Sequence, residues 1–107
     1  MTTRRRKPLA LHWTPRAIGD LEAVGDYIAL DNPAAAKRWV EGLMATAVRA
    51  SRAPFAGRRV PEFARDDIRE VLKRNYRIVY RITGQRVEVL TVFEAHRRLP
   101  DTALSSS

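Results

Sequence analysis

The chain has 107 residues, of which 45% are hydrophobic and 30% charged, so size and composition predict one globular domain. It contains no cysteine and only two histidines, which excludes disulfide scaffolds, thiol chemistry and thiolate zinc sites, and argues against a histidine metal site. No apolar run approaches the ~18–20 residues that cross a bilayer, and we expect a cytoplasmic protein that needs no cofactor.

Positive charge is the strongest compositional signal. The formal net charge is +8, and 17 of the 20 basic residues are arginine, whose planar guanidinium suits phosphates and carboxylates. Residues 8–53 are neutral, whereas residues 54–107 hold eleven basic and seven acidic side chains. We therefore expect electrostatic function in the C-terminal half, within a domain over 9–100. Residues 1–8 are predicted to form a disordered basic tail, and 101–107 a flexible one.

The N-terminal half predicts a strand followed by two helices. Residues 9–13 alternate as in a short strand, and Thr14-Pro15 then supplies an N-cap and a proline at the first helical position. This helix runs to about residue 30. Asn32-Pro33 starts a second helix, over 33–49, by the same chemistry, and so tight a turn predicts an antiparallel helical hairpin.

The C-terminal half changes to a period of two. Residues 54–61 are predicted to be a loop, and strands follow over 68–74, 76–83 and 86–95. In the last strand the alternation sets Val87, Val89, Thr91 and Phe93 against Glu88, Leu90, Val92 and Glu94.

These elements predict an α+β fold. It comprises an N-terminal strand, an antiparallel helical hairpin and a three-stranded antiparallel meander, with both helices packed on one face of the sheet. The first strand is expected to join the sheet, which then has four strands. The other face is expected to be open, with Arg77 and Arg81 on one face of the middle strand.

Nucleophile elbows and glycine-rich phosphate loops are absent from the sequence. What remains is a basic set that could bind a nucleic acid or another target: Arg58, Arg59, Arg69, Arg77, Arg81, Arg97 and Arg98. With His96 as acid or base, Arg81 and Arg97 could support metal-free RNA cleavage. The alternatives are cross-strand ion pairs for the arginines, a solvated strand-end histidine, and core packing for Tyr76 and Tyr80.

A succession of short motifs resembles the RelE/ParE family of bacterial toxins. They are Trp13-Thr14-Pro15, residues 26–29, Asn32-Pro33, residues 57–62, Arg69-Glu70, residues 76–82 and residues 95–100. The resemblance implies the toxin of a type II toxin–antitoxin pair, with a helical hairpin on an antiparallel sheet. It also implies a cognate antitoxin, for which Arg69, Tyr76, Arg77 and Tyr80 are the predicted contacts.

The family divides by target. RelE-like members cleave mRNA on the ribosome and carry a tyrosine or histidine near the C-terminus, whereas ParE-like members inhibit DNA gyrase. Here no tyrosine follows Pro100, and the segment over 57–62 resembles the ParE side. We therefore expect a gyrase inhibitor. The alternatives are a ribosome-dependent nuclease using His96, and a degenerate toxin that only binds its antitoxin.

Overall fold

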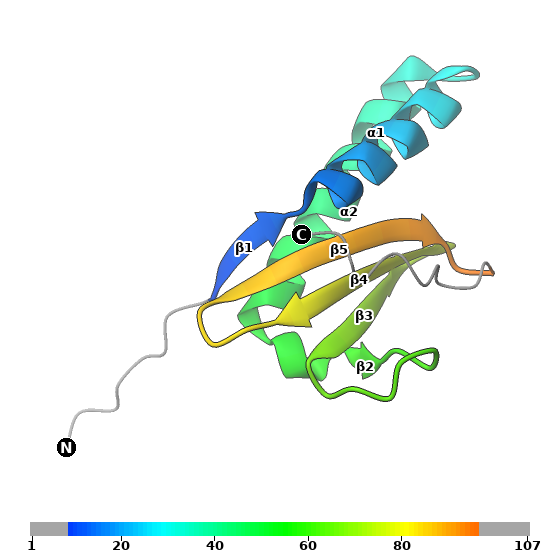
Figure 1. Cartoon of the computed structure of the whole chain (residues 1–107). Coiled ribbons are helices and arrows are strands. Elements are labelled where there is room, and N and C mark those ends of the chain that lie inside the picture. Colours follow the sequence, from blue (N-terminus) through cyan, green and yellow to red (C-terminus); the bar gives the residue numbers. More distant parts are fainter. Residues whose placement is uncertain (1–8, 97–107) are drawn as a thin grey trace.

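The structure, a computed structural model, describes residues 9–96 as two helices packed against one face of a five-stranded sheet (Figure 1). The sheet has the order β1-β5-β4-β3-β2, in which β1 runs parallel to β5 and the other neighbours are antiparallel. This confirms the predicted α+β class. The elements are β1 (Ala10–Trp13), α1 (Pro15–Ala29), α2 (Pro33–Arg52), the 3₁₀ helix η1 (Pro54–Ala56), β2 (Arg58–Arg59), β3 (Ile68–Lys73), β4 (Tyr76–Ile82) and β5 (Arg86–Glu94).

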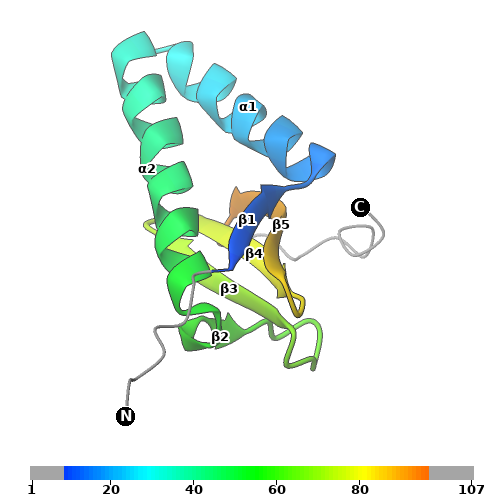
Figure 2. The same cartoon turned by 90° about the vertical axis from the view of Figure 1, so that its left-hand side faces the viewer.

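Both helices begin where their capping residues predicted. The Thr14 hydroxyl accepts a hydrogen bond from Ala17 N at 3.2 Å, and Asn32 Oδ1 accepts one from Ala35 N at 3.0 Å. Helix α2 continues past its predicted end as far as Arg52. The two helices form an antiparallel hairpin, which rises well beyond the edge of the sheet (Figure 2).

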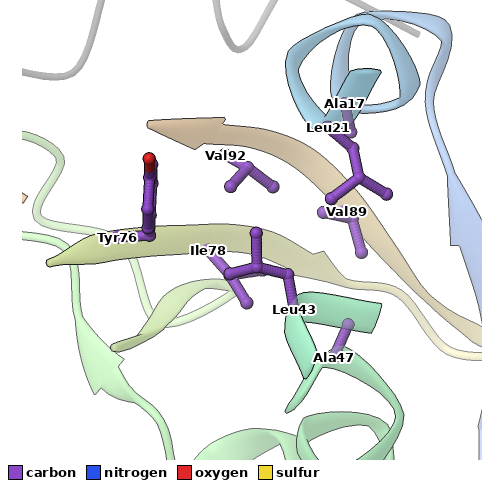
Figure 3. Packing of buried hydrophobic residues seen from close by; sticks show 8 residues of the cluster. All are labelled: Ala17, Leu21, Leu43, Ala47, Tyr76, Ile78, Val89 and Val92. Atoms are coloured by element: carbon purple, nitrogen blue, oxygen red, sulfur yellow. The ribbon is translucent and has the colours of Figure 1, made fainter. Parts of the chain in front are cut away.

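The main core lies between the hairpin and the sheet. Leu43 of α2 and Ile78 of β4 are both fully buried at its centre. Figure 3 shows side chains of both helices converging on those of β4 and β5. The residues of this cluster are Ala17, Leu21, Leu43 and Ala47 from the helices, and Tyr76, Ile78, Val89 and Val92 from the strands. Burial of this apolar surface is the main contribution to the stability of a chain without disulfides.

The opposite face of the sheet is also covered, so the prediction of an open face is wrong. Val60 and Phe63, from the segment between β2 and β3, pack with Ile68, Val79 and Leu90 in a second cluster. The prediction of an uninterrupted loop over 54–61 is wrong for a related reason. That segment holds η1 and the short strand β2, which pairs with β3 and becomes the fifth strand.

The alternation predicted for β5 fails at its centre. Val79 lies opposite Thr91 while its neighbour Tyr80 lies opposite Val89, so Leu90 is the extra residue of a β-bulge. Beyond the bulge, each residue of β5 lies on the face of the sheet opposite to the one that the alternation predicts. Val92 therefore joins Val89 in the core under the helices, and Phe93 packs against the cluster of the opposite face that holds Leu90.

Polar groups at the start of α1 form hydrogen bonds with the backbone groups around this bulge. The Thr14 hydroxyl donates to Val89 O at 2.8 Å, and the backbone N–H of Thr14 donates to the same oxygen. Asp20 accepts a hydrogen bond from Val92 N at 3.1 Å and another from the Thr91 hydroxyl. The bulge thereby fixes the position of α1 over β5.

Candidate functional site

The predicted arginines of β2 and β4 meet at a buried carboxylate. Glu70, on the face of β3 away from the helices, has a side chain with 0% exposure. Arg77 donates from Nε to Glu70 Oε1 at 2.7 Å, and Arg58 also bonds to Glu70. Two carboxylate-bound arginines on one buried acid form an internal ion-pair cluster rather than a free phosphate site.

Arg77 is held on three sides. Besides Glu70 it makes a bidentate contact with Glu62, at 2.9 Å and 2.8 Å, and its guanidinium lies 4.8 Å from the centre of the Phe93 ring. The hydrogen bonds to Glu62, together with those to Glu70, raise the pKa of Arg77 above its ordinary value. Its side chain is 6% exposed. Arg77 is therefore committed to internal carboxylates.

Arg69 ties η1 to the sheet. Its Nη1 donates to the backbone oxygens of Phe55 and Gly57 at 3.1 Å and 3.0 Å, and its guanidinium lies 5.2 Å from the Phe55 ring centre. It also pairs with Asp66, as does Arg59 at 3.4 Å. These contacts account for most of the donors of Arg69.

Both candidate tyrosines pack in the core, which confirms the core-packing alternative given from the sequence. Tyr80 is 1% exposed and donates its hydroxyl to Pro54 O at 2.6 Å, while Tyr76 meets Trp39 edge to face at a centroid distance of 5.6 Å. Burial raises the pKa of both tyrosines above the ordinary value. Gly57 lies directly against the Tyr80 hydroxyl, where a Cβ would come within 2.1 Å.

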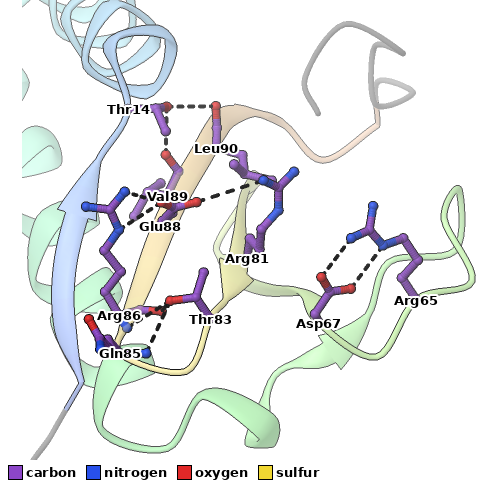
Figure 4. A network of polar contacts seen from close by, with 10 residues as sticks. All are labelled: Thr14, Arg65, Asp67, Arg81, Thr83, Gln85, Arg86, Glu88, Val89 and Leu90. Atoms are coloured by element: carbon purple, nitrogen blue, oxygen red, sulfur yellow. Dashed lines mark hydrogen bonds and ion pairs between the residues drawn. The ribbon is translucent and has the colours of Figure 1, made fainter. Parts of the chain in front are cut away.

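Arg81 belongs to a separate surface network (Figure 4). Its Nη1 lies 3.9 Å from Glu88, and Arg86 donates to the same carboxylate at 2.8 Å. Beside them Arg65 makes a two-point contact with Asp67, at 3.0 Å and 2.7 Å. Positive and negative side chains therefore alternate at this end of the sheet.

His96 lies apart from Arg81. It follows β5, where its Nδ1 is 3.7 Å from Glu94 and its side chain is 72% exposed. Arg81 pairs in register with Glu88, whereas Glu94 pairs with Tyr76, five positions further along β4. Five strand residues correspond to roughly 17 Å. The structure therefore does not bring His96 and Arg81 together, and Arg97 and Arg98 lie outside the described residues.

Two further features bear on the chemistry. Within residues 9–96, no group of three or more histidine, aspartate or glutamate side chains is arranged to hold a metal ion. No helix in this part of the chain is long and apolar enough to cross a membrane.

The fold places a helical hairpin on a sheet that is extended by a parallel first strand. Comparison with known proteins finds relatives of this chain. A family model described as the ParE toxin of the type II toxin–antitoxin system parDE matches residues 11–99. The chain belongs to this ParE toxin family. A solved structure titled as the chromosomal ParDE TA system from P. aeruginosa aligns with a TM-score of 0.70 and 23% identity, covering 83% of this chain and 98% of that one. No curated protein matches.

The alternative of cross-strand ion pairs is confirmed at Glu70, which pairs with Arg77 on the neighbouring strand. Sequence reasoning missed Glu62, which lies between the predicted loop and the next strand, and only the fold shows that it faces Arg77. It also missed a group of basic residues on α2. Their signal was present, because Arg38, Arg49 and Arg52 recur at a spacing that places them on one side of a helix.

Proposed function

We propose that this ParE-family toxin arrests growth by inhibiting DNA gyrase, and that a cognate antitoxin binds and neutralises it. Family membership supports the toxin assignment. The ParDE title of the structural relative, which names a toxin–antitoxin system, supports an antitoxin partner.

One observation favours gyrase inhibition over RNA cleavage. The arginines expected to bind a scissile phosphate are occupied within the fold, since Arg77 is paired with two glutamates and Arg69 bonds to backbone oxygens. His96 is exposed and distant from Arg81. A nuclease without a metal needs an acid or base and a cation held around one phosphate, whereas an inhibitor that binds an enzyme needs only a complementary surface.

The antitoxin contact is proposed at Tyr76 rather than at Arg69, Arg77 and Tyr80, whose polar groups are bonded within the fold. Tyr76 lines a hollow of 230 Å³ between α1 and β5, together with Asp20, Val24 and Tyr27. Tyr27 is 73% exposed and offers an aromatic surface beside it. Arg69, Arg77 and Tyr80 would then serve the antitoxin indirectly, by maintaining the sheet on which it rests.

Supercoiling of relaxed plasmid by purified gyrase, with and without the purified chain, tests the proposal. We expect inhibition at micromolar toxin, relieved by a stoichiometric amount of the antitoxin. The same preparation is added to a purified translation system, with the His96→Ala variant as the control for RNA cleavage. Intact supercoiling combined with mRNA cleavage that is lost in His96→Ala would overturn the gyrase assignment in favour of the nuclease. Activity in neither assay, with antitoxin binding kept, would indicate a degenerate toxin.

A further inference from the structure

The basic side chains of the described residues fall into two groups. Every arginine on α1, on the sheet beyond residue 74 and in the segment over 58–69 has a carboxylate within 4.0 Å. Within residues 9–96, the structure records no carboxylate partner for a second group, which lies entirely on α2 or at the end of β3 and the turn after it: Lys37, Arg38, Arg49, Arg52, Lys73 and Arg74.

Half of this second group lies along one side of α2. Arg38, Arg49 and Arg52 are separated by eleven and three residues, which places them near one line on the helix surface. Gly42 and Ala45 lie between them on the same side, and the exposed acid Glu41 borders it, three residues after Arg38. At a rise of 1.5 Å per residue, the line from Arg38 to Arg52 is about 21 Å long. We call these arginines, with Lys73 and Arg74, the basic stripe.

The β3–β4 turn completes the stripe at one end. It emerges beside α2 (Figure 2), and a pocket of 310 Å³ forms between them. The pocket is lined by Ala35, Arg38, Trp39, Gly42, Lys73 and Arg74. The absence of a side chain at Gly42 leaves room for Lys73, whose Cε would lie 3.4 Å from a Cβ at that position. Cations from two elements thus converge on one opening.

Arg74, which lines this pocket, adopts an unfavourable backbone conformation. Its φ of 53° lies in the left-handed region, where glycine or asparagine is preferred in a two-residue hairpin turn. Strain of this kind tends to mark positions at which the side chain has a use. Here the side chain adds an exposed cation to the pocket.

We propose that the basic stripe binds the phosphate backbone of duplex DNA. A stripe of 21 Å is matched by about six base pairs at 3.4 Å each. The other polyanion to consider is an acidic protein segment, which would also need apolar anchors. Of the exposed apolar residues of α2, Met44 lies about a third of a turn from Arg38, and Val48 borders the stripe one turn before Arg52. Trp39, which lines the pocket, packs against the core and Tyr76. One exposed apolar neighbour for five cations favours the backbone of DNA.

This inference goes beyond gyrase inhibition, because the contact requires no enzyme. It is tested by the fluorescence anisotropy of a labelled 20-base-pair duplex titrated with the full chain at several salt concentrations. Neutralising five phosphates predicts a slope of log affinity against log salt of about −4.5. The variant Arg38→Gln/Lys73→Gln/Arg74→Gln is expected to bind about tenfold or more weakly at 100 mM salt, with a slope less steep by about 2.7.

The matched control is Arg59→Gln/Arg65→Gln/Arg86→Gln, which removes three exposed charges that have carboxylate partners and do not belong to the stripe. We expect its affinity to change by less than about threefold. Basic residues outside 9–96 contribute equally to both variants. Equal losses in the two variants would show that only overall charge matters and would overturn the proposal. Absence of duplex binding at 50 mM salt would do the same.

Two further measurements separate folding and partner class from DNA contact. Arg74→Gly relieves the left-handed backbone, so its melting temperature should not fall, yet it should bind the duplex more weakly; unchanged affinity would count against the stripe. Poly-L-glutamate is the second probe. If it binds and the duplex does not, and the triple stripe variant loses this binding, the site belongs to an acidic protein. Because gyrase is absent throughout, these results are independent of the supercoiling assay.

Discussion

Removal of the Arg77 side chain should destabilise the fold strongly, because it isolates a buried charge. The Glu70 side chain has 0% exposure in the wild-type chain, and in Arg77→Ala it would retain only Arg58, whose own side chain is 57% exposed. Removing one partner of a buried pair costs about 3–5 kcal/mol. Since Arg58 offers partial compensation, we expect a loss of about 3 kcal/mol in the free energy of unfolding, out of the ~5–15 kcal/mol of an ordinary domain.

Urea unfolding followed by circular dichroism measures this loss. With a denaturant slope of about 1–1.5 kcal/mol/M for a domain of this size, the unfolding midpoint should fall by about 2–3 M. Arg58→Ala is the matched control, because it removes the other arginine bound to Glu70 from a solvent-exposed position, and should cost no more than about 1 kcal/mol. The double variant Glu70→Met/Arg77→Met should recover about half of the loss, because the fully buried carboxylate is removed together with its partner, whereas Glu62, which is 15% exposed, still loses its bidentate contact.

The reasoning is refuted if Arg77→Ala unfolds within 1 kcal/mol of the wild-type chain. If that variant were stable and yet failed to inhibit gyrase, Arg77 would be a target-binding residue, as the sequence alone suggested. Equal losses in Arg77→Ala and Arg58→Ala would also contradict the account, because they would show that burial of the ion pair makes no difference.

Three further changes test other parts of the structure. Gly57→Ala places a Cβ where the Tyr80 hydroxyl lies, so it should cost about 2–4 kcal/mol in urea unfolding through lost hydrogen bonding and overpacking; a cost under 0.5 kcal/mol would contradict this contact. Arg74→Gly should raise the free energy of unfolding by about 0.5–1 kcal/mol, and a decrease would show that the left-handed turn is unstrained. The hydrogen bond from Arg65 lowers the pKa of Asp67, so the pair stabilises the fold above the ordinary aspartate pKa, and this contribution is lost as the pH falls through the lowered value. In an NMR titration Arg65→Gln should raise the pKa of Asp67 towards its ordinary value, and an unchanged pKa would exclude Arg65 as the cause.

Local signals predicted the helices and most of the strands. Thr14-Pro15 and Asn32-Pro33 each determine a helix start through an N-cap and a proline that are adjacent in sequence. The observed helices begin at Pro15 and Pro33. Features that depend on distant residues were not predictable in this way. Strand β2 exists only because it pairs with β3, and the bulge at Leu90 appears only once β5 is aligned with β4.

The site was harder to predict, because net charge does not show which charges are paired. The C-terminal half holds the excess of arginine, yet Arg58, Arg69 and Arg77 are paired with acids brought to them by the fold. The first half is neutral overall, yet α2 presents arginines without a carboxylate partner in the described part of the chain, such as Arg38. The charge sums of the two halves therefore missed the arginines of α2, although Lys73 and Arg74 lie in the half that these sums favoured.

The central claim is that this ParE-family chain acts on gyrase and not on translation. Its most direct test is pulse-labelling of DNA and protein synthesis in bacteria, minutes after the chain is induced without its antitoxin. The account predicts that thymidine incorporation falls first and that a DNA-damage response follows, in His96→Ala as in the wild-type chain. An early fall in methionine incorporation, abolished by His96→Ala, would contradict it.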